Sequence, residues 1–113
     1  MNPLLMAFYG DDFTGSADAM EALTINGVRT ALFLGHPTEE RLQEKLQSLQ
    51  AVGISGTSRT MTPAQMDDEL PAQLKLLNGL APRLIHYKVC ATFDSSPQIG
   101  SIGRAADIAF NVI

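Results

Sequence analysis

Two adjacent carboxylates, Asp11 and Asp12, follow the first apolar run of the sequence and precede a helix-like segment. Such a pair can bind hydroxyl groups, act as a general base or hold Mg²⁺ through oxygen ligands. Adjacent residues of an extended chain point in opposite directions, so we expect the two aspartates to have different roles. The alternative is structural, because Asp, Thr and Ser cap helices well and one of the residues here could serve only as the N-cap.

A second polar segment, residues 55–62, combines small side chains with Ser58 and Arg59. Small residues let a ligand approach the backbone, and an arginine can bind a carboxylate through two parallel hydrogen bonds. A flexible loop with a solvated arginine is the alternative. Residues 35–38 form a third segment, which is typical of an ordinary turn, and we expect its His36 to be inert.

The fourth polar segment, residues 90–101, is rich in Ser, Thr, Asp and Gly and contains Thr92, Asp94 and Ser95. It ends at an expected helix N-terminus, a position that favours anions. A polar turn at residues 94–97 is the alternative to an anion-binding loop.

Lys88 stands inside the apolar run that precedes this loop. A lysine is costly in a parallel strand that is buried on both faces, unless it faces an anion or lies at the open end of the strand. An edge strand with one exposed face is the alternative. His86 and Cys90 share the face of Lys88 by alternation, and we expect His86 to be a hydrogen-bonded interior histidine and Cys90 to be a small core residue.

Four apolar runs predict the strands that position these segments. They are residues 4–9, 28–34, 51–54 and 84–89. Apolar residues at helical spacing predict a helix after each strand. A strand and a helix repeated four times imply a mainly parallel sheet with right-handed crossovers and helices on both faces, a Rossmann-like α/β fold. Ligands bind at the carboxyl ends of strands in such sheets, where all four polar segments lie.

The helix that begins at Thr62 has the strongest sequence signals. Thr62 and Gln65 form a capping box, with Pro63 at the first helical position. Pro71 interrupts the apolar stripe of this helix, which predicts a kink or two stacked short helices.

Length and composition limit the classes of protein to which the chain can belong. The 113 residues fit one domain, and 45% hydrophobic residues argue against disorder. No apolar segment reaches the ~18–20 residues of a membrane span, and the N-terminus lacks the basic region of a signal peptide. A net charge of −4 disfavours nucleic-acid binding, and a single cysteine excludes an internal disulfide. We therefore expect a cytoplasmic protein, and the apolar end at Ile113 indicates a truncated chain.

Three motifs follow one another along the chain. They are GDDFTGSAD at residues 10–18, SR at 58–59, and YKVCATFDSSP at 87–97 with GSIGRA at 100–105. In this order they resemble the N-terminal domain of the four-carbon acid sugar kinase family, which includes threonate, erythronate and 3-oxo-tetronate kinases. One departure is Ala91, where the family usually has serine, so any hydrogen bond from that hydroxyl is absent.

The resemblance implies an ATP-dependent kinase that phosphorylates a hydroxyl of a four-carbon sugar acid. Residues 1–113 would be the N-terminal domain that holds the small sugar-acid substrate. ATP and Mg²⁺ would be bound mainly by a Gly-rich C-terminal domain that is absent from this chain. Because phosphoryl transfer depends on positioning and charge stabilisation, the chain alone is expected to bind the acid without turning it over.

The resemblance also suggests roles for the polar residues. Arg59 and Lys88 would hold the substrate carboxylate or offset phosphate charge. Asp12 would contact hydroxyls and is the predicted base, with Asp11 as its partner or as a metal-side ligand, although no metal site is assigned to the chain. The expected substrate-binding residues are Asp11, Asp12, Ser58, Arg59, Lys88, Thr92, Asp94 and Ser95. Arg104 could pair with Asp94 as scaffold.

Two alternatives belong to other classes. The chain could be a noncatalytic sugar-acid-binding module or a truncated gene remnant. It could also fail to fold stably, because a stability of ~0.05–0.15 kcal/mol per residue leaves little margin if strands are missing. Neither nucleic acid nor a membrane is expected as a partner, and whether the chain forms a homo-oligomer stays open.

Overall fold

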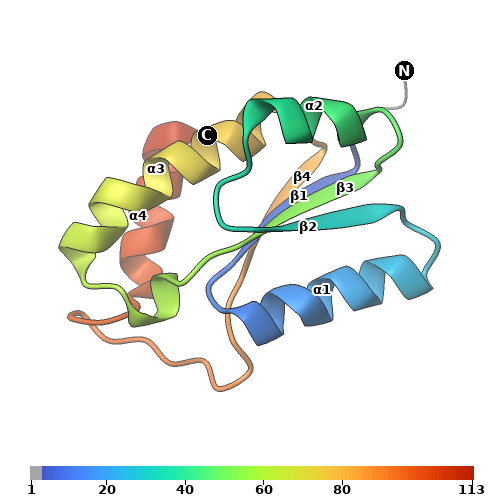
Figure 1. The fold of residues 1–113 in the computed structure, drawn as a ribbon. Coiled ribbons are helices and arrows are strands. Elements are labelled where there is room, and N and C mark those ends of the chain that lie inside the picture. The colour runs from blue at the N-terminus through green and yellow to red at the C-terminus, as the bar shows by residue number, and fades with distance from the viewer. Residues whose placement is uncertain (1–3) are drawn as a thin grey trace.

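The computed structural model describes residues 4–113, which form a single sheet of parallel strands flanked by helices (Figure 1). The strands are β1 (Met6–Gly10), β2 (Thr30–Leu34), β3 (Ala51–Ser55) and β4 (Leu84–Lys88). The helices are α1 (Phe13–Ile25), α2 (Glu39–Leu46), the short 3-10 helix η1 (Ser58–Thr60), α3 (Pro63–Gly79) and α4 (Ile102–Val112). The predicted alternation of strand and helix is confirmed.

The sheet has the order β2-β3-β1-β4, and every neighbouring pair is parallel. The connection from β1 to β2 runs in one direction across the sheet, and the later connections run in the opposite direction. Right-handed crossovers therefore place α1 on one face and α2, α3 and α4 on the other, as Figure 1 shows. The predicted fold class, a parallel α/β sheet with helices on both faces, is confirmed.

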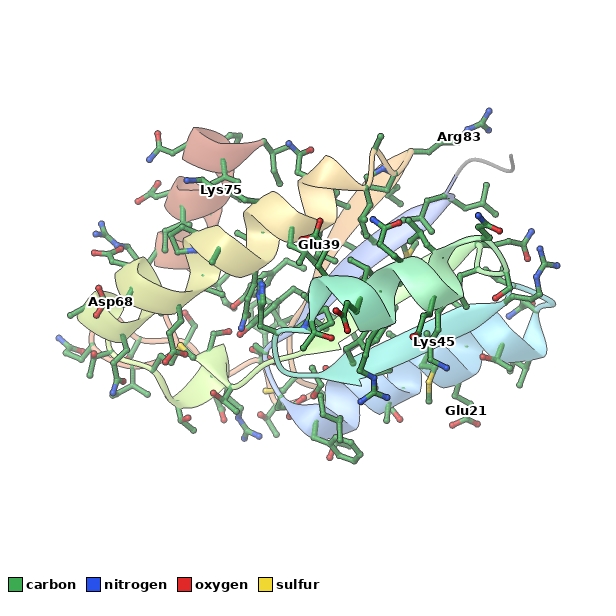
Figure 2. The ribbon with its side chains drawn as sticks, turned by 45° about the horizontal axis from the view of Figure 1, so that its top comes forward. Glu21, Glu39, Lys45, Asp68, Lys75 and Arg83 are labelled. Atoms are coloured by element: carbon green, nitrogen blue, oxygen red, sulfur yellow. The ribbon has the colours of Figure 1, made fainter. Side chains whose placement is uncertain are left out.

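The main core lies between the sheet and the face of α3 that carries apolar residues every three or four positions. It contains Ala7, Tyr9, Val52 and Ile54 from the strands and Met66, Leu70, Leu74 and Leu77 from α3. On the opposite face, the Phe8 ring lies over Gly53, where a Cβ would stand 2.1 Å from the ring. Charged side chains such as Glu39, Lys45 and Asp68 point away from the core (Figure 2).

The predicted capping box at the start of α3 is present, with Thr62 and Gln65 bonded to each other's backbone N–H groups. Pro71 lies inside α3, which runs without interruption to Gly79, so the alternative of two short helices is wrong. Proline removes one backbone donor, but the apolar stripe continues on the same face and keeps α3 on the sheet.

β4 lies at an edge of the sheet, and its face on the α1 side is open. Leu84 is 55% exposed and His86 is also exposed, so the expectation of an interior histidine is wrong. Lys88 ends the strand and is half-buried, which confirms the edge-strand alternative. Within residues 4–113, no helix is long and apolar enough to cross a membrane.

Candidate functional site

The carboxyl ends of β1, β3 and β4 lie side by side, and the chain leaves them toward different faces of the sheet. β1 leads to α1 on one face, whereas β3 and β4 lead to helices on the other. A parallel sheet opens a crevice where neighbouring connections diverge in this way. Three of the predicted polar segments meet at this crevice, and the exposed His36 follows β2 at its side.

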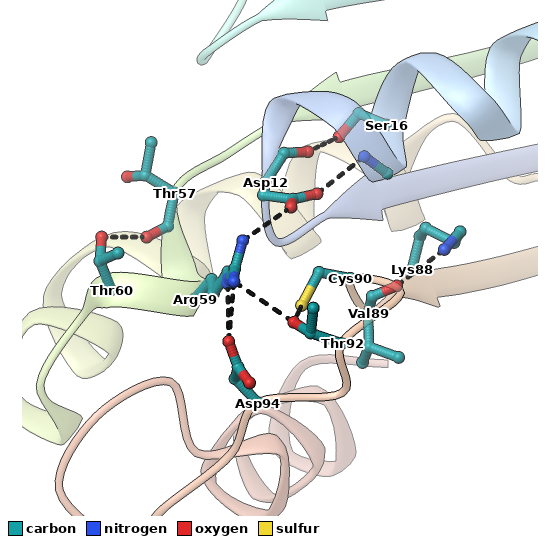
Figure 3. Close-up of polar contacts among 11 residues, drawn as sticks. Asp12, Ser16, Thr57, Arg59, Thr60, Lys88, Val89, Cys90, Thr92 and Asp94 are labelled. Carbon is teal, nitrogen blue, oxygen red and sulfur yellow. Dashed lines mark hydrogen bonds and ion pairs between the residues drawn. The ribbon is translucent and has the colours of Figure 1, made fainter.

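Arg59 joins the three segments through its guanidinium (Figure 3). Its Nη2 and Nε atoms donate to Asp94 Oδ2 at 2.7 and 3.2 Å, and its Nη1 donates to Asp12 Oδ2 at 3.3 Å. Nη2 also donates to Thr92 Oγ1 at 3.3 Å. The hydrogen bond from Arg59 lowers the pKa of the Asp94 carboxyl, and the same contact raises the pKa of Arg59. Arg59 is therefore an ordered cation at the centre of the site.

Asp11 and Asp12 have different surroundings, as their adjacency predicts. Asp12 is the N-cap of α1, and its Oδ1 accepts a hydrogen bond from the Gly15 N–H at 2.8 Å. Asp11 is only 2% exposed, and its Oδ1 has no hydrogen-bond partner. Burial, followed by the charge of Asp12, raises the pKa of the Asp11 carboxyl. The capping role is thus confirmed for Asp12, while Asp11 keeps a buried acceptor without a partner.

Ser58 lies beneath the site rather than on its surface. The side chain is fully buried, and its Oγ lies 2.5 Å from the Tyr87 hydroxyl. Tyr87 stacks on Tyr9 with ring centroids 5.4 Å apart, and burial raises the pKa of Tyr87. These contacts give Ser58 a supporting role, in which it fixes the backbone that carries Arg59.

Lys88 and Cys90 line the β4 side of the site. Lys88 Nζ donates to the Val89 carbonyl at 2.7 Å, and Cys90 Sγ lies 2.9 Å from Thr92 Oγ1. The contact with Thr92 lowers the pKa of the buried Cys90 thiol. Asp11, Asp12 and Cys90 each offer one ligand atom within 4.8 Å of the others, so they could hold a cation. The carboxylates suit Mg²⁺, but the sulfur suits softer metals such as Zn²⁺.

The loop between β4 and α4 packs against η1. Gly100 has a φ of +60°, its N–H donates to the Met61 carbonyl at 2.8 Å, and a Cβ there would stand 2.3 Å from the Arg59 carbonyl oxygen. Only glycine allows this approach. Ser95 Oγ accepts from the Ile102 N–H at the start of α4.

Arg104 does not take the scaffold role that the sequence suggested. It forms a bidentate ion pair with Asp67 of α3, so the expected pairing with Asp94 is wrong. The reason is topological, because α4 packs beside α3 and carries Arg104 away from the site.

A cavity of about 630 Å³ opens beside Arg59, between the strand ends and α3. Of the eight predicted substrate-binding residues, Asp11, Asp12 and Arg59 line this cavity. The other five do not line it; they are Ser58, Lys88, Thr92, Asp94 and Ser95. Glu69 and Gln73 of α3 also line it, and the sequence analysis missed both residues. Their spacing gave no specific signal, because polar residues four apart at the border of an apolar stripe are common on amphipathic helices.

Residues 6–113 match the model of a family described as the sugar-binding N-terminal domain. The chain belongs to this family. The match covers all four strands and all the predicted site residues, which is what the resemblance of the three motifs implies.

Curated relatives of this domain are sugar-acid kinases. A 3-oxo-isoapionate kinase of Paraburkholderia graminis is 55% identical over 93% of this chain, which spans 22% of that protein. The 3-oxo-tetronate kinases of Cupriavidus necator and Brucella melitensis are 32% and 33% identical over 91% and 95% of the chain, and it spans 23% of each. The chain thus spans less than a quarter of the length of the curated relatives it matches.

Two solved structures share the fold. A Salmonella typhimurium LT2 protein described as a tRNA synthase has a TM-score of 0.81 at 28% identity, with 97% of this chain and 25% of that chain covered. A domain of unknown function from Bordetella bronchiseptica, a domain-swapped dimer with bound citrate, has a TM-score of 0.79 at 19% identity, with 95% of this chain and 25% of that chain covered. The second likeness supports the fold alone.

Proposed function

We propose that residues 1–113 are the N-terminal sugar-acid-binding domain of a two-domain kinase. The observation that carries the proposal is the position of Arg59, an ordered cation beside a cavity at the carboxyl ends of the strands, in a chain of the sugar-binding N-terminal domain family. A guanidinium binds a carboxylate through two hydrogen bonds, so Arg59 would exchange its contact with Asp94 for the acid group of the substrate.

The proposed reaction of the whole protein moves the γ-phosphoryl group of ATP to a hydroxyl of the sugar acid. ATP and Mg²⁺ would be bound mainly outside residues 1–113, because no glycine-rich phosphate loop of the Walker type occurs in this sequence. The chain would supply substrate positioning, on which phosphoryl transfer largely depends. Lys88 and Arg59 would add positive charge near the transferred group.

The base assignment moves from Asp12 to Asp11 in this proposal. Both oxygens of Asp12 already accept hydrogen bonds, from the Gly15 N–H and from Arg59, and these contacts weaken a base. Asp11 Oδ1 has no partner, and the raised pKa of Asp11 brings the carboxyl closer to the range in which a base is effective. Thr92, Asp94 and Ser95 would border the bound acid, and Ser58 would support Arg59 from below.

The proposed substrate is a 3-oxo sugar acid. The relative that is 55% identical is named for 3-oxo-isoapionate, and the relatives at 32% and 33% are named for 3-oxo-tetronate. 3-Oxo-isoapionate is therefore the first acid to test, with 3-oxo-tetronate, threonate and erythronate as the four-carbon alternatives.

The proposal is tested by calorimetric titration of these acids into the chain and its variants. Arg59→Ala should weaken binding at least about tenfold, because a charge-assisted bidentate contact contributes ~1.5–3 kcal/mol. Lys88→Ala should weaken it less, and Lys45→Ala, on the exposed face of α2, serves as the matched control. If Arg59→Ala and Lys88→Ala both keep the affinity of the unchanged chain, the anion-binding assignment is wrong.

A noncatalytic sugar-acid-binding module is the second candidate. It is favoured by the same cavity together with the missing Walker-type loop. Sequencing the gene beyond the Ile113 codon discriminates the two, because the kinase requires a glycine-rich second domain there.

A further inference from the structure

The cavity beside Arg59 has a wall that the motif residues do not build. Glu69 and Gln73 lie one helical turn apart on α3, and both line the same cavity as Asp11 and Asp12. The capped N-terminus of α3 and the apolar stripe beneath hold this wall in place. A rigid helix therefore presents two polar side chains to any molecule that enters.

Two of the residues that line the cavity carry a buried acceptor without a hydrogen-bond partner. Gln73 Oε1 is buried and has no hydrogen-bond partner, and the same is true of Asp11 Oδ1. A buried polar atom without a partner costs ~1–3 kcal/mol, and such atoms in folded proteins usually meet a ligand or an ordered water. Both residues line one cavity, so a single ligand can contact them both.

The charges of the side chains that line the cavity restrict which ligands can bind there. Asp11, Asp12 and Glu69 are carboxylates, and Arg59 is the only cationic side chain among the described residues that line the cavity. A ligand can place one carboxylate at Arg59, but the groups that it turns toward α3 must donate hydrogen bonds. Hydroxyl groups donate and carry no charge, so they suit this wall.

We propose that Glu69 and Gln73 form a hydroxyl-recognition subsite that selects among sugar acids. The inference rests on the proposed function, because Arg59 must hold the acid group for the hydroxyls to reach α3. Glu69 would accept from a hydroxyl at the mouth of the cavity, and the Gln73 amide would bond to one deeper inside. A site that hydrogen-bonds a hydroxyl rejects analogues without it, since its polar groups would stay unpaired.

The test compares threonate, which carries hydroxyls, with butyrate, which has the same carbon count and none. Chemical-shift titration of the ¹⁵N-labelled 113-residue chain measures both affinities and reports whether each variant is folded. Gln73→Met and Glu69→Gln should each weaken threonate binding about five- to tenfold and leave butyrate binding within about twofold. Arg59→Ala should weaken the binding of both acids.

Gln43→Met and Glu44→Gln, at exposed positions of α2, are the matched controls and should change neither affinity. Glu69 is exposed, so its variant keeps the test sound even if Gln73→Met unfolds the chain. If Gln73→Met and Glu69→Gln keep the threonate affinity while Arg59→Ala loses it, the subsite is wrong and the proposed function stands. Equal weakening of threonate and butyrate would also contradict the subsite, and a chain that binds neither acid would contradict the proposed function itself.

Discussion

Arg59 and Asp11 differ in how the fold satisfies their charged groups. Arg59 is bonded to Asp94, Asp12 and Thr92, so its cation is held in place before any ligand arrives. Asp11 is buried with an unpartnered oxygen, an arrangement that costs stability in the free chain. Functional sites often hold such groups, because a ligand supplies the missing contact.

The free-energy penalty of burying the ionised Asp11 carboxylate should make the stability of the chain depend on pH. The folded chain raises the pKa of Asp11 above its ordinary value of 3.8, so folding favours the protonated acid. The penalty is therefore absent below pH 3.8, grows as the pH rises through the raised pKa, and is complete above it. Asp11→Asn should raise the unfolding temperature at pH 7 by a few degrees, or about 1 kcal/mol, and should give no gain at pH 3.

Thermal unfolding of both chains from pH 3 to pH 8 measures this difference. Asp18→Asn, at an exposed position of α1, is the control and should change the unfolding temperature little at any pH. Equal stabilities of the chain and its Asp11→Asn variant at pH 7 would show that burying the ionised carboxylate does not destabilise the fold.

The elements of the site are held by close backbone contacts as well as by side chains. The loop after β4 meets η1 where Gly100 faces the Arg59 carbonyl, and the N-cap of α1 brings Asp12 to Arg59 from the other side. The three connections meet around the guanidinium of Arg59. Their positions depend on one another, although they are far apart in the sequence.

Gly100→Ala should therefore disturb the site without removing any binding side chain. Its Cβ would stand 2.3 Å from the Arg59 carbonyl oxygen at a φ of +60°, so we expect a loss of at least ~1 kcal/mol and weaker acid binding. Gly79→Ala, where no heavy atom lies within 4 Å, should be neutral or slightly stabilising. Calorimetric unfolding compares the two, and equal effects would contradict the packing of the loop on η1.

The sequence predicts the elements better than it predicts their contacts. Period and capping signals identify the four strands and the helices α1 to α4, because they report local burial and local hydrogen bonds. They do not predict η1, which lies in a segment that was expected to carry no helix. Pro71 predicted a kink or two short helices, but α3 is continuous because its packing on the sheet holds it together. The expectation of an interior His86 was wrong because it depended on strand order. The order puts β4 at an edge of the sheet, and strand order is a long-range property.

The site residues also fall into those that local sequence signals locate and those that depend on tertiary packing. The motifs locate Arg59 and the two aspartates, since carboxyl ends of parallel strands must meet. The partner of Arg104 and the cavity wall at Glu69 and Gln73 depend on how α3 and α4 pack, and one-dimensional spacing does not reveal that.

At the scale of the whole molecule, the chain presents a cavity at one end of the sheet and an open strand edge at its side. The chain spans 22% of the 3-oxo-isoapionate kinase that it resembles, so the proposed ATP-binding part would complete the reaction from outside these residues. We propose that this chain alone recognises the sugar acid, and that it does so at the carboxyl ends of β1, β3 and β4.

The most direct test is to map where 3-oxo-isoapionate binds on the ¹⁵N-labelled chain by amide chemical shifts. We expect saturable shifts that are confined to the connections after β1, β3 and β4 and to the α3 residues that line the cavity. They should gather around Asp12, Arg59, Gln73 and Thr92. Shifts that gather at the open edge of β4 around Leu84, or no saturable shifts at all, would contradict the proposal.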